Sequence, residues 1–176
     1  MDKYEIAGVS VGMLVLAVLF GWIFTAPYLS NQGLGRTPGL IIGGTLTDAP
    51  TDFTDLNDSV QGPMMMKQSG FPPFVHYLSW VGTEEGVISA TRPDGGLWAK
   101  RVRERGGNGF LRIGEETYAM EATEILDNEV RLAMMAQWAA RSGRTLDEPL
   151  YPGSEPLNEW EVFFWTPRDN AMAASH

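Results

Sequence analysis

The clearest alternation of apolar and polar positions lies in the middle of the chain. Four short runs are rich in aromatic and β-branched residues, and turn-forming residues separate them: 74–81, 87–91, 110–113 and 117–125. Short alternating runs broken by turn residues are typical of strands joined in hairpins. Two such hairpins in succession favour an antiparallel meander that curls into a barrel.

Shorter apolar runs lie on either side of these hairpins. Residues 40–46 predict a first strand with a bulge at two glycines, and residues 63–70 predict a strand followed by a turn. Residues 159–166 predict a final aromatic strand that closes the barrel. We expect the three methionines at 64–66 to fill core space, because their flexible side chains fit irregular gaps.

Two helices are predicted in the same part of the chain. Residues 97–104 follow a Pro-Asp-Gly-Gly turn and predict a short helix. Residues 127–143 predict a longer helix, because Asp127 suits the N-cap, Arg141 suits the last turn and Gly143 can end it. Three apolar residues recur at a spacing of four and form the face expected to pack on the barrel: Val130, Met134 and Trp138.

The N-terminal region carries a long apolar run. Residues 6–25 contain no charge and are long enough to cross a hydrocarbon core of about 30 Å, so we predict a single transmembrane helix that is retained as an anchor. A cleaved signal peptide is the alternative, which Ala26 followed by Pro27 disfavours. Gly8 and Gly12 form a small-xxx-small pattern, which predicts docking of another transmembrane helix. Ordinary glycine frequency in membrane spans is the alternative.

These elements divide the 176 residues into a transmembrane anchor (1–26), a linker (27–39), a β-barrel domain (40–167) and a tail (168–176). The predicted fold class is mainly β, of the α+β type, with one N-terminal transmembrane helix followed by a barrel and one bracing helix. Lys3 before the anchor and Arg36 after it give a weak positive-inside signal. We expect a single-pass membrane protein whose barrel lies on the periplasmic or exterior side.

Composition narrows the chemistry. The formal net charge is −9, and the chain contains no cysteine and two histidines. Disulfides, thiol nucleophiles and cysteine ligands are therefore excluded, and we expect no metal site. The net acidity opposes binding of nucleic acid. Ser69 and Ser79 have no evident base, and His76 is expected at the barrel mouth, so no catalytic residue is assigned.

Nearly half of the basic residues lie close together in the sequence. Six of the thirteen Lys and Arg residues fall in one stretch: Arg92, Lys100, Arg101, Arg103, Arg105 and Arg112. We interpret this stretch as a solvated helix face whose charges are balanced by Glu104, Glu115 and Glu116. A site that attracts an anion is the alternative.

The order of the elements resembles that of the flavin- and deazaflavin-binding split β-barrel proteins. It runs from the Lys-Gln-Ser-Gly turn at 67–70 through a strand pair, Trp98 with its basic cluster and the hairpin at 110–119 to the helix ending near Gly143. The nearest similarity is to the nitroreductase or quinone-reductase-like branch, with a pyridoxamine-phosphate-oxidase-like fold, including members that carry an N-terminal membrane anchor. The resemblance implies a split β-barrel over residues 40–167.

In that family a basic turn holds the cofactor phosphate, and residues 67–70 occupy the matching place. A lysine and a serine hydroxyl can hold a phosphate, but they lack the bidentate geometry of arginine. The resemblance implies a cofactor-binding set made of Lys67, Ser69, Arg92 and Lys100. We expect this set to be degenerate and no cofactor to be bound, with FMN or a deazaflavin as the alternative.

Two functions follow from these expectations. The first is an accessory or binding subunit that docks on a larger membrane complex, with membrane lipid and other transmembrane subunits as partners. The second is a flavin- or deazaflavin-dependent reductase of a quinone-like acceptor. The resemblance also implies a homodimer. The sequence favours the first function, because the matched turn carries one charge and an exterior barrel would not be supplied with reduced nicotinamide or deazaflavin.

Overall fold

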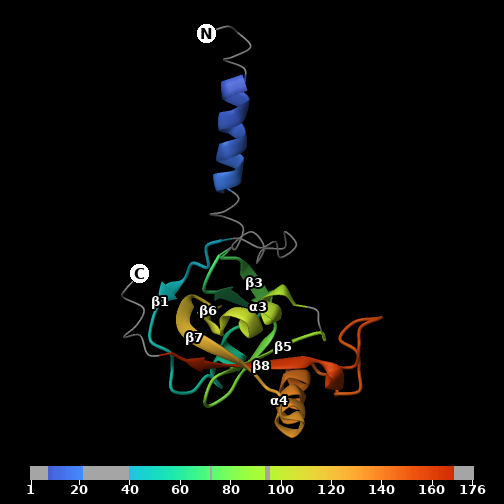
Figure 1. The fold of residues 1–176 in the computed structure, drawn as a ribbon. Coiled ribbons are helices and arrows are strands. Elements are labelled where there is room, and N and C mark those ends of the chain that lie inside the picture. The colour runs from blue at the N-terminus through green and yellow to red at the C-terminus, as the bar shows by residue number, and fades with distance from the viewer. Residues whose placement is uncertain (1–7, 22–39, 72, 94–95, 169–176) are drawn as a thin grey trace.

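A β-barrel forms the centre of the molecule (Figure 1). The structure is a computed structural model that describes residues 8–21, 40–71, 73–93 and 96–168. Its strands are β1 (Thr45–Leu46), β2 (Met64–Gln68), β3 (Val75–Leu78), β4 (Trp80–Gly82), β5 (Val87–Thr91), β6 (Asn108–Ile113), β7 (Glu116–Glu124) and β8 (Glu161–Pro167). Its helices cover residues 8–21, α2 (Leu56–Ser59), α3 (Leu97–Arg105), α4 (Asn128–Arg141) and the short 3₁₀ helix η1 (Leu157–Glu159).

One bent stretch of chain brings the two ends of the sheet together. The strands pair in the order β3-β2-β6-β7-β8-β5-β4, so β3 and β4 are the end strands. Only Ser79 separates β3 from β4 in the sequence. The stretch pairs with β2 through its first half, where His76 faces Met66, and with β5 through its second half, where Trp80 faces Ser89. The sheet is therefore a nearly closed antiparallel barrel, as predicted.

The pairing of the hairpins differs from the predicted meander. Both predicted hairpins form, as β4–β5 and β6–β7, and β8 is the predicted final strand. However, β5 pairs with β8 rather than with β6, and β6 pairs with β2. The nine-residue α3 lies between β5 and β6 in the chain, so the second hairpin starts away from the first. The predicted strand at 40–46 is reduced to β1, which pairs in parallel with the start of β7.

Large side chains fill the barrel interior. The core includes Met64, Met66, Trp98, Leu111, Tyr118, Met120, Phe163 and Trp165, each at most 4% exposed. Trp98 meets Phe163 edge-on, with ring centres 4.7 Å apart. The expectation that the methionines fill core space is confirmed. The interior is a packed core, as in other barrels of few strands.

The α4 helix packs on the outside of the barrel, as predicted; Met134 and Trp138 of the predicted face take part in the contact, and Val130 does not. Its buried residues are Met135, Trp138 and Ala139, each at most 4% exposed, whereas Val130 is 45% exposed. Arg131 explains the difference, because its guanidinium donates to the backbone carbonyls of Asn158 and Trp160. These contacts turn the polar Arg131 toward η1 and the start of β8 and leave Val130 outside.

The predicted N-cap of α4 is confirmed. Oδ1 of Asp127 accepts hydrogen bonds from the backbone N–H groups of Glu129 and Val130, both at 3.0 Å. These bonds satisfy two donors that the first turn of a helix would otherwise leave without partners.

Residues 8–21 form a separate helix whose apolar side chains are exposed. Among the described residues, no helix combines the length and the apolarity needed to cross a membrane. The predicted span at 6–25 continues beyond this helix in both directions, outside the described residues. The predicted linker (27–39) and the tail from residue 169 lie outside them as well.

Candidate functional site

The turn matched to the phosphate site has one backbone amide already engaged. Lys67 is half-buried in β2, and burial lowers the pKa of its ammonium group. Ser69 follows in an exposed position, and its N–H donates to the Asn108 carbonyl at 2.9 Å. An anion at this turn would therefore meet the Lys67 charge and the Ser69 hydroxyl, but not the Ser69 amide.

The other two predicted cofactor residues lie on different segments. Arg92 follows β5, and its guanidinium carbon lies 5.9 Å from the centre of the Tyr151 ring. Lys100 is exposed on α3. The structure describes all four predicted residues, and no hydrogen bond, ion pair or ring contact joins any two of them. Lys67 and Ser69 lie two residues apart at the end of β2.

The basic stretch is solvated, as predicted, at four of its six residues but not at the other two. Arg101 and Arg112 are each only 5% exposed. Arg101 lies three residues after Trp98 on the buried face of α3, so the helical period turns it toward the barrel. Arg112 lies in β6 and pairs with Glu115 at 3.2 Å, which confirms Glu115 as a partner. How α3 and β6 pack on the barrel therefore decides which of the basic residues are buried.

Arg103 fixes α3 to the sheet. Its Nε donates to Oε2 of Glu124 at 2.8 Å, and its Nη2 lies 2.9 Å from Oε1 of Glu161. Glu124 ends β7 and Glu161 begins β8, so the guanidinium joins three elements. The hydrogen bond that Arg103 donates to Glu124 raises the pKa of the guanidinium above its usual value. Its charge is balanced by these two carboxylates rather than by the predicted Glu104.

Buried polar side chains lie where α3 covers one end of the barrel. Gln68 is 3% exposed, and its Nε2 donates to the Trp98 carbonyl at 3.0 Å. Within the described residues, neither Oε1 of Gln68 nor Nε2 of His76 has a hydrogen-bond partner. Burial, and then the charge of Arg101, lower the pKa of His76. The imidazole is therefore neutral at pH 7.

Acidification is expected to destabilise the protein through His76. The pKa of His76 in the folded state lies below its value of about 6.5 in an unfolded chain, so the unfolded chain takes up the proton first as the pH falls. The contribution of neutral His76 to the free energy of unfolding is complete above about pH 6.5 and is lost as the pH falls to the folded-state pKa. His76→Gln cannot take up this proton. We expect its urea midpoint to fall less than that of the wild type between about pH 7.5 and about pH 5. Equal falls in the two proteins would contradict the assignment.

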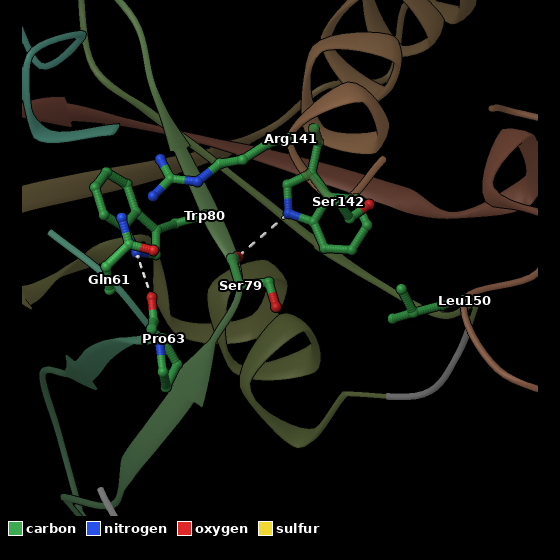
Figure 2. A pocket seen from close by; sticks show the side chains of 9 residues that line it. Gln61, Pro63, Ser79, Trp80, Arg141, Ser142 and Leu150 are labelled. Atoms are coloured by element: carbon green, nitrogen blue, oxygen red, sulfur yellow. Dashed lines mark hydrogen bonds between the residues drawn. The ribbon is translucent and has the colours of Figure 1, made fainter. Parts of the chain in front are cut away.

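A cleft opens beside the bend between β3 and β4 (Figure 2). Its volume is about 270 Å³. The lining side chains come from the loop before β2, the bend itself, the end of α4 and the following loop: Gln61, Ser79, Trp80, Trp138, Arg141 and Leu150. The cleft exists because Ser79 pairs with neither β2 nor β5, so the barrel wall is interrupted there.

Two indole rings and one guanidinium are held in place around this cleft. Nε1 of Trp80 donates to the Gly62 carbonyl at 3.1 Å, and Nε1 of Trp138 donates to the Ser79 carbonyl at 3.3 Å. The Arg141 guanidinium carbon lies 4.2 Å from the centre of the Trp80 ring. Figure 2 shows Arg141 reaching from α4 toward Trp80, above Ser79.

No sequence pattern predicted this cleft. Trp138 was predicted on the helix face that packs on the barrel, and Arg141 in the last turn, where its charge favours the helix dipole; both roles are compatible with the structure. The one sequence feature that could have indicated it is Ser79, a polar residue inside the apolar run at 74–81. Such a residue can indicate a break in a strand, but it cannot show that the end of α4 lies beside the break.

The described residues contain no group of three His, Cys, Asp or Glu side chains that could hold a metal ion. Comparison with known protein families matches none of them to this chain, and comparison with curated proteins finds no relative. The function is therefore argued from the residues and their geometry.

Proposed function

We propose that this protein is an accessory subunit of a larger membrane complex, with residues 6–25 as its single transmembrane anchor. One observation carries the proposal: the helix at 8–21 exposes nine large apolar side chains, each 52–67% accessible, namely Val9, Val11, Met13, Leu14, Val15, Leu16, Val18, Leu19 and Phe20. Four of these are consecutive, so the apolar surface surrounds the helix. A helix that is apolar on all sides belongs in a membrane or a large core.

The energetics favour lipid as the environment of this helix. Burial of one large apolar side chain contributes about 1.5–3 kcal/mol, so nine would contribute on the order of 14–27 kcal/mol. The barrel has its own core, which includes none of these nine residues. Twenty uncharged residues in helical form extend about 30 Å, the thickness of a hydrocarbon core.

A glycine strip on this helix supports docking on another transmembrane helix. A Cβ atom added at Gly8 or Gly12 would meet nothing within 4 Å, so the strip is open along the described helix. Small residues four apart let two helix backbones approach closely in lipid. We propose this strip as the contact with a transmembrane helix of the complex, and a second copy of this chain as the competing partner.

The state of the predicted cofactor set favours an accessory role over a reductase. Lys67 is the single charge of the matched turn, the Ser69 amide already donates to Asn108, and Arg92 and Lys100 lie on other segments. We propose that the domain is a split barrel that keeps the fold of the cofactor-binding proteins it resembles and has lost most of their phosphate site. From the weak positive-inside signal we propose that this barrel lies on the periplasmic or exterior side.

Membrane fractionation tests the anchor. The full-length wild type is expected to stay in the membrane pellet after alkaline carbonate extraction. The double variant Leu14→Arg/Leu16→Arg is expected to shift largely to the supernatant, because each arginine near the centre of a span costs about 2.5–3.5 kcal/mol. Leu126→Arg is the matched control, since Leu126 is 81% exposed on the barrel domain. Release of the wild type by carbonate would contradict the anchor.

Extraction of native membranes in mild detergent tests the accessory role. A colourless protein that migrates with other membrane subunits, and loses them when Gly8→Ile and Gly12→Ile are combined, supports the proposal. A stoichiometric yellow chromophore in protein purified without other subunits would instead favour the flavin-type reductase. A complex containing only this chain would identify a homodimer.

A further inference from the structure

We propose that the cleft beside Ser79 binds a small carboxylate that carries a single aromatic ring. The ligand's carboxylate would meet Arg141, and its ring would lie in the cleft against Leu150 and the small accessible part of the two indoles. The inference is independent of the membrane anchor, because no residue of the helix at 8–21 lines the cleft. The carboxylate could belong to a free aromatic acid or to the C-terminal aromatic residue of a peptide, which share this chemistry.

The Arg141 guanidinium is held in a fixed position without an ion pair. It stacks on Trp80 at 4.2 Å, donates through Nη1 to Oδ1 of Asn57, and donates through Nη2 to the Val60 carbonyl at 3.3 Å. Both acceptors are neutral, and no carboxylate of the described residues lies within ion-pair distance of it. Asp58 is the acidic group that acts on it electrostatically. A guanidinium has five N–H donors, so three stay available to a ligand.

The surroundings of Arg141 therefore differ from those of Arg103 and Arg112. Arg103 and Arg112 are balanced by carboxylates at 2.9 and 3.2 Å. The Trp80 indole and the two neutral acceptors fix the orientation of the Arg141 guanidinium. None of the three carries a negative charge, so the positive charge of the guanidinium stays available to an anionic ligand. Arginine held in this way is suited to planar, two-point recognition of a carboxylate.

The floor of the cleft suits an aromatic ring. The indole N–H groups of Trp80 and Trp138 both donate to wall carbonyls, so the rings keep their orientation. The two residues are 3% and 4% exposed, so each offers the cleft only a small part of its apolar surface. Their side chains come from β4 and α4, and Leu150 completes the apolar part. Aromatic rings gain about 0.5–1.5 kcal/mol beyond area burial when they pack edge-on or offset.

The size and polarity of the cleft limit the ligand. A volume of about 270 Å³ corresponds to roughly nine water molecules at about 30 Å³ each and lies just below the usual range for drug-sized ligands. A single ring with a short acid is the size that fits. The lining contains no Asp or Glu, while Ser79, Ser142 and Gln61 add hydroxyl and amide groups at the rim. A neutral or cationic ligand would leave the Arg141 charge unbalanced.

Fluorine NMR of para-fluorophenylacetate added to the full-length protein in non-ionic detergent tests the inference. The wild type is expected to broaden and shift the fluorine signal at millimolar ligand, and the uncharged para-fluorophenylacetamide is expected to bind at least tenfold more weakly. Arg141→Gln is expected to weaken binding of the acid about tenfold, because a charge-assisted hydrogen bond is lost. Arg144→Gln is the matched control, since Arg144 is exposed and bonded to Pro149 outside the cleft.

A second variant protects the test against a folding defect of Arg141→Gln. Ser79→Leu keeps the guanidinium and fills the cleft from an exposed position, so it is expected to abolish binding. A peptide ending in phenylalanine, with a free or an amidated C-terminus, separates the two sources of the carboxylate. The inference is supported if the wild type binds para-fluorophenylacetate or the peptide with a free C-terminus, and both Arg141→Gln and Ser79→Leu weaken that binding. Equal binding of acid and amide, unchanged binding by Arg141→Gln, or no binding of either acid would overturn it.

Discussion

Trp165→Ala is expected to lower the free energy of unfolding by about 4 kcal/mol. Trp165 is fully buried in β8, and its indole N–H donates to the Ser89 hydroxyl at 2.9 Å. The truncation opens a cavity inside the barrel. It also leaves the hydroxyl of Ser89, which is fully buried, without the hydrogen bond from Trp165. Urea unfolding of the full chain in mild detergent, followed by near-ultraviolet circular dichroism, measures the loss.

Two variants control this measurement. Trp165→Phe keeps most of the buried ring and loses only the N–H group, so its cost should fall well below that of Trp165→Ala. Phe71→Ala makes an aromatic-to-alanine change at a side chain that is 84% exposed, and its effect should stay within about 0.5 kcal/mol. A loss below about 1 kcal/mol for Trp165→Ala would show that the barrel core is not packed as described.

Gly107→Ala is expected to lower the free energy of unfolding by about 3 kcal/mol. A Cβ atom at this position would overlap the backbone N, C and O atoms of Ala122 in β7. The Gly107 carbonyl also accepts a hydrogen bond from the Ala122 N–H at 2.9 Å, so the two backbones cannot separate without losing it. The connection from α3 to β6 therefore requires a residue without a side chain. The same urea unfolding experiment measures the change.

Gly12→Ala is the matched control for this substitution. It makes the same chemical change at a helical position where a Cβ atom would meet nothing within 4 Å. Gly12 lies outside the barrel, so the unfolding of the barrel should be unchanged. Similar midpoints for Gly107→Ala and the wild type would mean that β6 and β7 do not hold Gly107 in close contact.

Local pattern was sufficient for the individual elements. Alternation predicted the hairpins that became β4–β5 and β6–β7, and the Asp127 cap predicted where α4 begins. Strand direction and turn chemistry depend on residues close in the chain, so they can be read from short windows. Which strands become neighbours depends on contacts far apart in sequence. The pairing of β5 with β8, more than seventy residues along the chain, could not be read in this way.

The candidate sites show the same division more sharply. The positions of Lys67 and Ser69 at the end of one strand were predictable, since both belong to one short turn. Arg101 and Arg103 are two residues apart on α3, yet Arg101 is buried on the face of the helix that meets the barrel. Arg103 instead pairs with Glu124 and Glu161. Only the packing of α3 on the barrel assigns these different roles, because a helix turns neighbouring residues to different sides.

By itself, the sequence determined the apolar run at 6–25, the two hairpins, the final strand and the two longer helices of the barrel domain, and the absence of cysteine chemistry. These properties depend on residue type and local spacing. The tertiary structure alone decided that one bent stretch closes the barrel at Ser79, and that Arg141 lies over Trp80 beside it. The reason is physical: the pairings of β2 with β6 and of β5 with β8, and the contact of Arg141 with Trp80, all join segments more than forty residues apart, whose packing no local pattern encodes.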